Sequence, residues 1–348
     1  MDDLAIELDG VWKIFGDRPT QIVEDIRREG LTKAQVLEKF NAVVGIADVS
    51  FQVNAGEIFC IMGLSGSGKS TLVRHINRLI EPTAGKITLL GQQILDLSEN
   101  QLREIRAKKV GMVFQHMALF PHRSVRDNVA YPLEIRNEPK LRRWDVSQRM
   151  LSMVGLDGFE DRFPTELSGG MQQRVGLARA LASDPDVLLM DEPFSALDPL
   201  IRRQLQDQFL DLSAQLNKTT LFITHDLDEA IRLGTRIAIM NDGKIVQIGT
   251  PEEIVTNPAD DYVRDFVKDI SKLKLVSART ILVPMDDYIP SPGEDLSQSP
   301  RTNADTDLDG LVDLSITTSH PIVITDPEGN DIGVVSKDRL LQGIQGGQ

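Results

Sequence analysis

Residues 58–79 hold the feature that most constrains the fold of this chain. The run Ile58-Phe-Cys-Ile-Met62 has the continuous apolar character of a strand that is buried on both faces. A glycine-rich turn follows directly, and residues 70–79 then have the pattern of a helix. A buried strand that enters a helix through such a turn predicts an α/β fold with a parallel sheet.

The turn, Gly63-Leu-Ser-Gly-Ser-Gly-Lys69-Ser70-Thr71, fits the P-loop pattern G-x-x-x-x-G-K-[ST]. In such a loop, backbone N–H groups surround phosphate oxygens, the lysine adds positive charge, and the serine hydroxyl binds Mg²⁺. We therefore expect ATP and Mg²⁺ as cofactors. A glycine-rich helix entry without a ligand is the alternative interpretation. The expected ATP-binding residues here are Gly63, Leu64, Ser65, Gly66, Ser67, Gly68, Lys69, Ser70 and Thr71, of which Ser70 is also an expected metal ligand.

A second apolar run, Val187-Leu-Leu-Met-Asp191-Glu192, ends in two carboxylates. At the carboxyl end of a strand beside the P-loop strand, Asp191 can bind Mg²⁺ and Glu192 can act as the general base that activates the attacking water. A buried strand also ends in Asp-Glu simply to reach solvent. The P-loop pattern earlier in the chain favours the functional interpretation.

Further runs predict how the chain is organised. Thr219–Thr224 is a third apolar strand, and residues 92–166 are rich in helix signals, which predicts a helical subdomain inserted between core strands. Residues 17–44 contain the capping box Thr32-Lys-Ala-Gln35, which predicts a helix inserted into a β-hairpin. We expect one domain over residues 1–268 and a smaller one over 269–348.

The peptide Leu167-Ser-Gly-Gly-Met-Gln-Gln-Arg174 starts a predicted helix and is similar to the signature motif of ATP-binding cassette (ABC) ATPases. Other motifs of that family match in the same order along the chain. Gln115 resembles the Q-loop glutamine, Ser195-Ala-Leu-Asp198 resembles the D-loop, and His225 resembles the switch histidine. The resemblance covers residues 1–268 and implies a cassette with a RecA-like core and an inserted helical subdomain.

This resemblance implies a composite site, in which Ser168, Gly169 and Gly170 contact the γ-phosphate of ATP held by a second copy, so the working unit is a homodimer. It further implies that Gln115 senses Mg²⁺ and the transmembrane partner. His225 contacts the γ-phosphate as a second catalytic residue, and Asp198 crosses the interface. Phe15 aligns with the aromatic residue that stacks on adenine. Trp12 is the competing candidate, and core packing is the alternative interpretation of Phe15.

The composition restricts the partners. A net charge of −14 disfavours a nucleic-acid binder, because phosphate contacts need a basic face. No window approaches the roughly 18 apolar residues of a membrane span, and the lone Cys60 together with an acidic start predicts the cytoplasm.

The segment after Gln115 is similar to the importer groove that receives a permease helix, with Met117, Leu119 and Phe120 as apolar contacts; ordinary core packing of these side chains is the alternative.

The N-terminal insertion, the string Ile61–Ser70 and Leu197-Asp-Pro-Leu-Ile201 resemble ATP-binding subunits of the glycine betaine/proline importer branch, which handles small methylated amines such as betaines, choline and trimethylamine N-oxide. The resemblance implies a peripheral ATPase at the cytoplasmic face of the inner membrane. Its partners would be two permease subunits and, indirectly, a periplasmic substrate-binding protein. A soluble ABC ATPase acting on nucleic acid or ribosomes is the alternative function.

The tail departs from the cassette pattern. Residues 288–310 are turn-rich, polar and acidic, which predicts a loop. Pro321–Ser336 is similar to the closing hairpin of a CBS module, and a short helix over 337–344 follows, so residues 269–348 are expected to form a small α+β domain. Because CBS modules bind ligands in pairs, a single copy favours a dimer-bracing or vestigial role.

Overall fold

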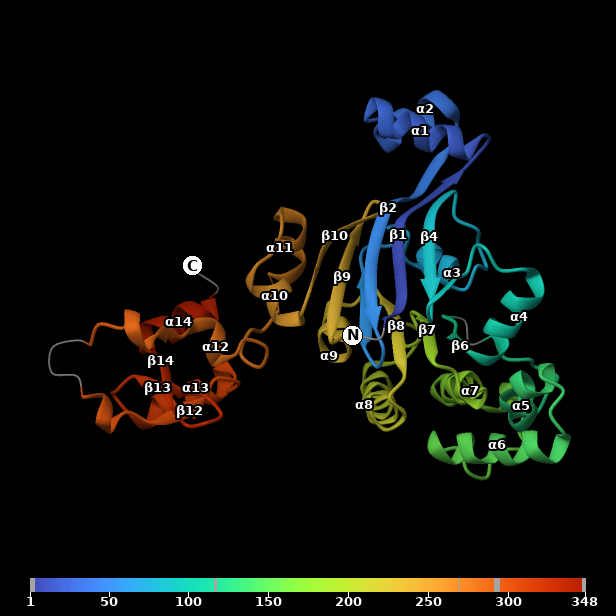
Figure 1. Ribbon diagram of the computed structural model, residues 1–348. Helices are drawn as coiled ribbons and strands as arrows, with labels where there is room; N and C mark the ends of the chain where they lie inside the picture. Colours follow the sequence, from blue (N-terminus) through green and yellow to red (C-terminus); the bar gives the residue numbers. More distant parts are fainter. Residues whose placement is uncertain (1–3, 116–117, 269, 291–294, 346–348) are drawn as a thin grey trace. The chain divides into compact units, whose positions relative to one another are not determined.

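The computed structural model describes residues 4–115, 118–268, 270–290 and 295–345 of this chain (Figure 1). The chain divides into two compact units, residues 1–248 and 249–348, which are described separately below. No helix among these described residues has both the length and the apolar character to cross a membrane.

The core sheet of the first unit has the strand order β10-β9-β3-β8-β7-β6. The neighbours β9, β3, β8, β7 and β6 pair in parallel, as the alternation of strands and helices predicts. Every residue of β3, β7 and β8 is buried, which explains their uninterrupted apolar sequences. The strands are β3 (Ile58–Met62), β6 (Val110–Val113), β7 (Val187–Asp191), β8 (Thr219–Thr224), β9 (Arg236–Asn241) and β10 (Lys244–Gly249).

A second, antiparallel sheet has the order β2-β1-β4-β5. The helices α1 (Pro19–Glu29) and α2 (Lys33–Phe40) are inserted between β1 and β2 at the far end of this hairpin (Figure 1). The predicted capping box is present, because Thr32 Oγ1 accepts from Gln35 N at 3.3 Å and Thr32 N donates to Gln35 Oε1 at 2.8 Å. The strands are β1 (Leu4–Phe15), β2 (Val43–Asn54), β4 (Ala84–Leu89) and β5 (Gln92–Gln93).

One apolar core joins the two sheets and fixes α3 (Lys69–Ile76), the helix that follows the P-loop. The rings of Phe51 on β2 and Phe59 on β3 stack with centroids 5.1 Å apart. Leu72, Val73 and Ile76 of α3 are fully buried against the same core. Because α3 is anchored along its buried face, its amino-terminal end is held in a fixed place.

The packed helices next to the core sheet begin and end later in the chain than the range 92–166 that the sequence predicted for a helical subdomain. They are α5 (Val125–Ile135), α6 (Lys140–Met153) and α7 (Gly169–Ala182), which pack on one another. The expected range 92–166 also contains β6, which pairs with β7 from Val110↔Val187 onward and therefore belongs to the core sheet. α4 (Glu99–Lys108) packs on β6 and therefore also belongs to the core side. A short 3-10 turn (Pro164–Glu166), α8 (Pro199–Leu216) and α9 (Leu227–Leu233) complete the cassette elements.

The second unit starts at residue 249, not at the predicted 269. The reason is a polar contact: the carboxylate of Glu252 accepts hydrogen bonds from Ser277 N at 2.8 Å, from Ser277 Oγ at 3.1 Å and from the Thr280 hydroxyl. These bonds tie α10 (Pro251–Thr256) to α12 (Ala278–Ile281). The chain between them carries α11 (Asp261–Val267).

The predicted α+β architecture of the tail is confirmed. Its sheet has the order β11-β14-β13-β12, and β13 and β14 form the predicted hairpin. Its helices and strands bury one apolar core of their own. The elements are β11 (Val283–Pro284), β12 (Arg301–Asn303), α13 (Leu308–Thr317), β13 (Ile322–Thr325), β14 (Asp331–Val335) and α14 (Lys337–Gln345), with 3-10 turns at Met285–Asp287 and Leu296–Gln298.

The acidic loop predicted over residues 288–310 is shorter than expected. Residues 291–294 of that loop lie outside the described residues. Arg301–Asn303 form β12, which pairs in parallel with β13. Leu308 is fully buried and starts α13, whose cap is the Asp307 carboxylate accepting from Gly310 N at 2.8 Å. Part of the acidity therefore serves to start a helix.

Candidate nucleotide site

The P-loop links β3 to α3 and is held in shape from inside. The buried ammonium of Lys69 donates to the carbonyl oxygens of Gly63 at 2.7 Å and Leu64 at 3.0 Å. Burial lowers the pKa of this ammonium, while the negative charges of Glu192 and Asp191 act in the opposite direction. Gly63 has φ +156°, and a Cβ there would lie 2.1 Å from the carbonyl oxygen of Met240, so this position requires glycine.

Ser70 and Asp191 meet at the end of the buried strand β7. The Ser70 hydroxyl donates to Asp191 Oδ1 at 2.8 Å, and Arg74 Nη2 lies 3.7 Å from Asp191 Oδ2. Within the described ranges, no three His, Cys, Asp or Glu side chains gather in a way that could hold a metal by themselves. A hydroxyl and one carboxylate next to a phosphate-binding loop fit Mg²⁺, which keeps several waters and binds substrate phosphates.

Glu192 lies at the centre of three predicted residues. Its Oε2 atom is 3.4 Å from the amide nitrogen of Gln115, which donates, and 3.0 Å from Nδ1 of His225. Gln115 follows β6 and His225 follows β8, so the parallel strands bring the three side chains to one edge of the sheet. Glu192 has φ +47°, an uncommon backbone conformation for a residue other than glycine, and such positions cluster at functional sites.

Most of these groups line one cleft of about 570 Å³, but Asp191 and Arg74 are not among its lining residues. Val43, Val44 and Gly45 of β2 also line the cleft. The sequence did not predict this part of the wall, because these residues directly follow the inserted helices and were expected to lie outside a strand. Gly63 and Ser67 are not among the lining residues. The predicted residues that line the cleft are Leu64, Ser65, Gly66, Gly68, Lys69, Ser70, Thr71, Gln115, Glu192 and His225.

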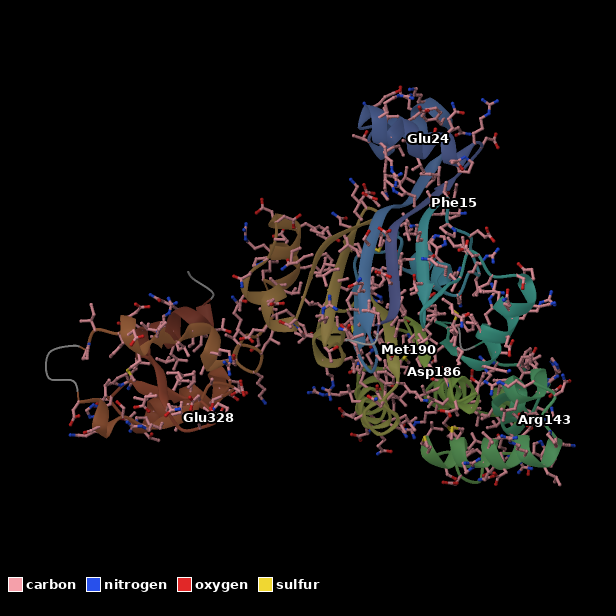
Figure 2. All side chains as sticks on the ribbon, in the orientation of Figure 1. Phe15, Glu24, Arg143, Asp186, Met190 and Glu328 are labelled. Atoms are coloured by element: carbon pink, nitrogen blue, oxygen red, sulfur yellow. The ribbon has the colours of Figure 1, made fainter. Side chains whose placement is uncertain are left out.

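The two aromatic candidates for adenine stacking differ in exposure. Trp12 is 5% exposed, and its indole N–H donates to Asp48 Oδ1 at 3.2 Å, so this ring is packed and bonded within the fold. Phe15 is 43% exposed at the end of β1, paired with Val43 of the cleft wall (Figure 2). A Cβ on Gly45 would lie 2.8 Å from the Phe15 ring, so the ring lies next to a residue of the cleft wall, although Phe15 is not itself a lining residue.

The signature residues lie elsewhere on the surface of the chain. Ser168 caps α7 by accepting from Met171 N at 3.4 Å, and Asp198 caps α8 by accepting from Ile201 N at 3.1 Å. A Cβ on Gly170 would lie 2.7 Å from Ile201 Cγ2, so the starts of these two helices are in contact. Ser168, Gly169, Gly170 and Asp198 do not line the cleft. Within this chain, the predicted signature residues and Asp198 therefore lie apart from the cleft.

Comparisons with known proteins agree with this geometry. The sequence model of the ABC transporter family matches residues 46–195. The trimethylamine N-oxide transport system ATP-binding protein TmoW of Pelagibacter ubique is 41% identical over 99% of this chain and 98% of its own length. This chain belongs to the ATP-binding subunits of ABC transporters. The ATPase of such subunits is coupled to transport, and the predicted alternative of a soluble ABC ATPase is not favoured.

Other similar proteins point the same way. The glycine betaine transport ATP-binding protein OpuAA of Bacillus subtilis is 54% identical over 80% of this chain, which spans 66% of that relative's length. A solved dimeric ATP-binding cassette, bound to ADP and Pi in a post-hydrolysis state, is 30% identical with a TM-score of 0.60, over 71% of this chain and 98% of that one. The predicted ABC cassette fold is thereby confirmed.

Proposed function

We propose that this cassette hydrolyses ATP at the cytoplasmic face of the inner membrane to drive the import of a small methylated amine such as trimethylamine N-oxide, glycine betaine or choline. The substrate class is taken from the names of the similar transport subunits for trimethylamine N-oxide, glycine betaine and choline. The observation that carries the catalytic part is the cleft in which the P-loop, Glu192 and His225 meet.

Each residue has a role that follows from its place. Lys69 and the P-loop N–H groups hold the phosphates, and Ser70 and Asp191 supply a hydroxyl and a carboxylate to Mg²⁺, which would neutralise phosphate charge. Glu192 accepts the proton of the attacking water. Gln115 and His225 hold the Glu192 carboxylate in place through the bonds at 3.4 and 3.0 Å.

The separation of the signature residues from the cleft supports a homodimer. In that arrangement Ser168, Gly169 and Gly170 of one copy contact the nucleotide held by the P-loop of the other, and Asp198 lies at the interface. A similar cassette of solved structure is dimeric, with ADP and Pi bound. Exposed apolar side chains on the tail helices, Ile316 (76%) and Leu341 (57%), favour a dimer-bracing role for the tail, in which its CBS-like hairpin acts without a ligand.

A mixing experiment tests the composite site. Lys69→Ala removes the P-loop charge but keeps the signature, and Ser168→Arg blocks the signature but keeps the P-loop. Neither variant alone hydrolyses ATP. An equal mixture recovers about a quarter of the wild-type rate, since half of the randomly formed dimers pair the two variants and each of these has one intact site. No recovery, with both variants folded by thermal melting, would contradict the composite site.

A groove of about 680 Å³ is the proposed docking place for the permease. It combines apolar walls from β6 and α5 with arginines from α4 and α7, which suits an amphipathic helix with acidic side chains. Of the three predicted apolar contacts, Phe120 lines it, Leu119 does not, and Met117 lies outside the described residues. The sequence did not point to Arg103, Arg106, Phe114, Tyr131 and Ile135, which line the groove from elements distant in sequence.

Reconstitution tests the whole function. The chain is purified with its two permease subunits in lipid vesicles, and ATP-driven uptake of labelled trimethylamine N-oxide, glycine betaine and choline is measured with a substrate-binding protein present. Uptake of at least one of these amines is expected, and Ile135→Asp in the groove lowers both membrane binding and uptake while the ATPase of the isolated chain persists. Stimulation of the ATPase by DNA or ribosomes in the absence of membrane would overturn the proposal.

A further inference from the structure

The turn between β9 and β10 supports the P-loop from behind. Gly243 N donates to the Ser67 carbonyl oxygen at 2.9 Å, and the Gly243 carbonyl oxygen accepts from Ala47 N of β2 at 2.8 Å. A Cβ on Gly243 would lie 2.7 Å from the carbonyl oxygen of Gly45, a residue of the cleft wall. The turn therefore joins the P-loop to β2, whose residue Gly45 also lines the cleft.

The N-terminal insertion reaches this turn through one side chain. Lys33 Nζ of α2 lies 2.8 Å from Asp242 Oδ1, in the turn residue just before Gly243. The Lys33 side chain is 27% exposed, although its partner is 73% exposed, so the lysine is the more confined member of the pair. The pair thus connects the insertion, the turn and Ser67 of the P-loop in series.

Helix formation does not account for a lysine at this position. Lys33 is the first residue of α2 after its cap Thr32, and the first turn of that helix contains no acidic residue. A cation at a helix amino terminus is unfavourable, because the helix dipole places positive charge there. The capping box of Thr32 and Gln35 already satisfies the end of the helix. The pairing with Asp242 supplies the interaction that the helix itself does not.

We infer that the insertion is a brace for the nucleotide cleft, and that Lys33 and Asp242 are positioning residues that hold the β9–β10 turn, and through it the P-loop, in its phosphate-binding shape. The inference rests on the proposed nucleotide site. Removing either member lets the turn move away from Ser67 and Gly45. The backbone donors of the P-loop are then less well placed, so nucleotide affinity falls while the groups that activate water are untouched.

Nucleotide affinity of the isolated chain tests the brace. The probe is a fluorescent ADP analogue with Mg²⁺, which is not hydrolysed, and steady-state ATP hydrolysis gives KM and kcat separately. Lys33→Met and Asp242→Asn each raise Kd and KM about two- to five-fold, the size expected for a partly exposed ion pair, with kcat unchanged. Asn tolerates the φ of +48° at position 242. The double variant is no weaker than either single one, and Lys33→Arg retains wild-type affinity.

Two comparisons separate the brace from a direct attraction between Lys33 and the nucleotide. If Lys33 attracts the nucleotide by its charge alone, Asp242→Asn removes a negative charge and tightens binding, which overturns the brace. Lys39→Met is the matched control, because Lys39 lies on the same helix but pairs with Glu29 inside the insertion, at 3.0 Å; it leaves affinity unchanged. Unchanged Kd in Lys33→Met also overturns the brace, whereas a wild-type chain that binds no nucleotide overturns the proposed site and the brace with it.

Discussion

Replacing Glu192 by glutamine removes the proposed base with little change in shape. The amide oxygen can still accept from Gln115 and His225, which lie 3.4 and 3.0 Å from Glu192 Oε2. Glutamine and glutamate meet the same cost at a φ of +47°. The change therefore isolates proton acceptance from fold and packing.

The expected loss follows from the contribution of a general base. Such a group accelerates a reaction by about 10² to 10⁴, which corresponds to about 2.7 to 5.4 kcal/mol of the barrier at 1.36 kcal/mol per factor of ten. Nucleotide affinity, unlike turnover, is not expected to fall. The Glu192 carboxylate lines the same cleft as the P-loop, so its removal takes one negative charge away from the phosphates, and affinity stays equal or increases.

Two measurements on the isolated dimer check both expectations. Phosphate release under saturating ATP gives turnover, and titration with the fluorescent ADP analogue gives affinity. Glu104→Gln is the control, because it makes the same chemical change at an exposed position of α4. Turnover within ten-fold of wild type in Glu192→Gln would refute the assignment of the base. Weaker nucleotide binding would refute the electrostatic part of the reasoning.

Two further predictions concern adenine and pH. Phe15→Ala raises the Kd of the ADP analogue about five-fold through loss of stacking. The control is Leu37→Ala, because Leu37 is an exposed apolar residue (51%) of α2. Equal effects on Kd in both variants would contradict stacking. Burial raises the pKa of the Glu229 carboxyl, and its bond from Gln206 at 2.9 Å lowers the pKa less. The folded protein thus keeps a proton at pH values where the unfolded chain has lost it, so wild-type stability falls as pH rises through this window. Glu229→Gln removes this fall in stability. Melting temperatures are measured from pH 4.5 upward, and the same pH dependence in the wild type and in Glu229→Gln would disprove the argument.

The sequence could predict the parts of the site that depend on local patterns. The P-loop needs consecutive residues of fixed type, and β3, β7 and β8 need uninterrupted apolar runs, so both are visible in the sequence. The sequence did not show which of Trp12 and Phe15 is exposed. Residues three apart on a strand face opposite sides, and which side is buried depends on how β1 pairs with its neighbours.

The errors arose where pairing or polar contacts decide the structure. Arg301–Asn303 have no apolar pattern, and they form a strand because β13 offers a free edge for parallel pairing. The boundary near residue 249 depends on the bonds of Glu252 to Ser277 and Thr280, which no periodicity signals. The wall residues Val43 to Gly45 come to the cleft through the β1–β2 hairpin, whose ends are separated by the inserted helices.

The net charge of −14 is compatible with a site for polyanions, because the net charge and the charged groups of the site act on a phosphate over different distances. Charges beyond about 8 Å are largely screened at physiological ionic strength. Lys69, by contrast, is 4% exposed and lies within 3.0 Å of two P-loop carbonyl oxygens, so it acts on a phosphate at contact distance, where screening is weak. The Lys33–Asp242 pair lies between these cases, because Asp242 is 73% exposed. Salt therefore weakens the proposed brace before it weakens the P-loop, and the difference in nucleotide affinity between the wild type and Lys33→Met narrows as ionic strength rises.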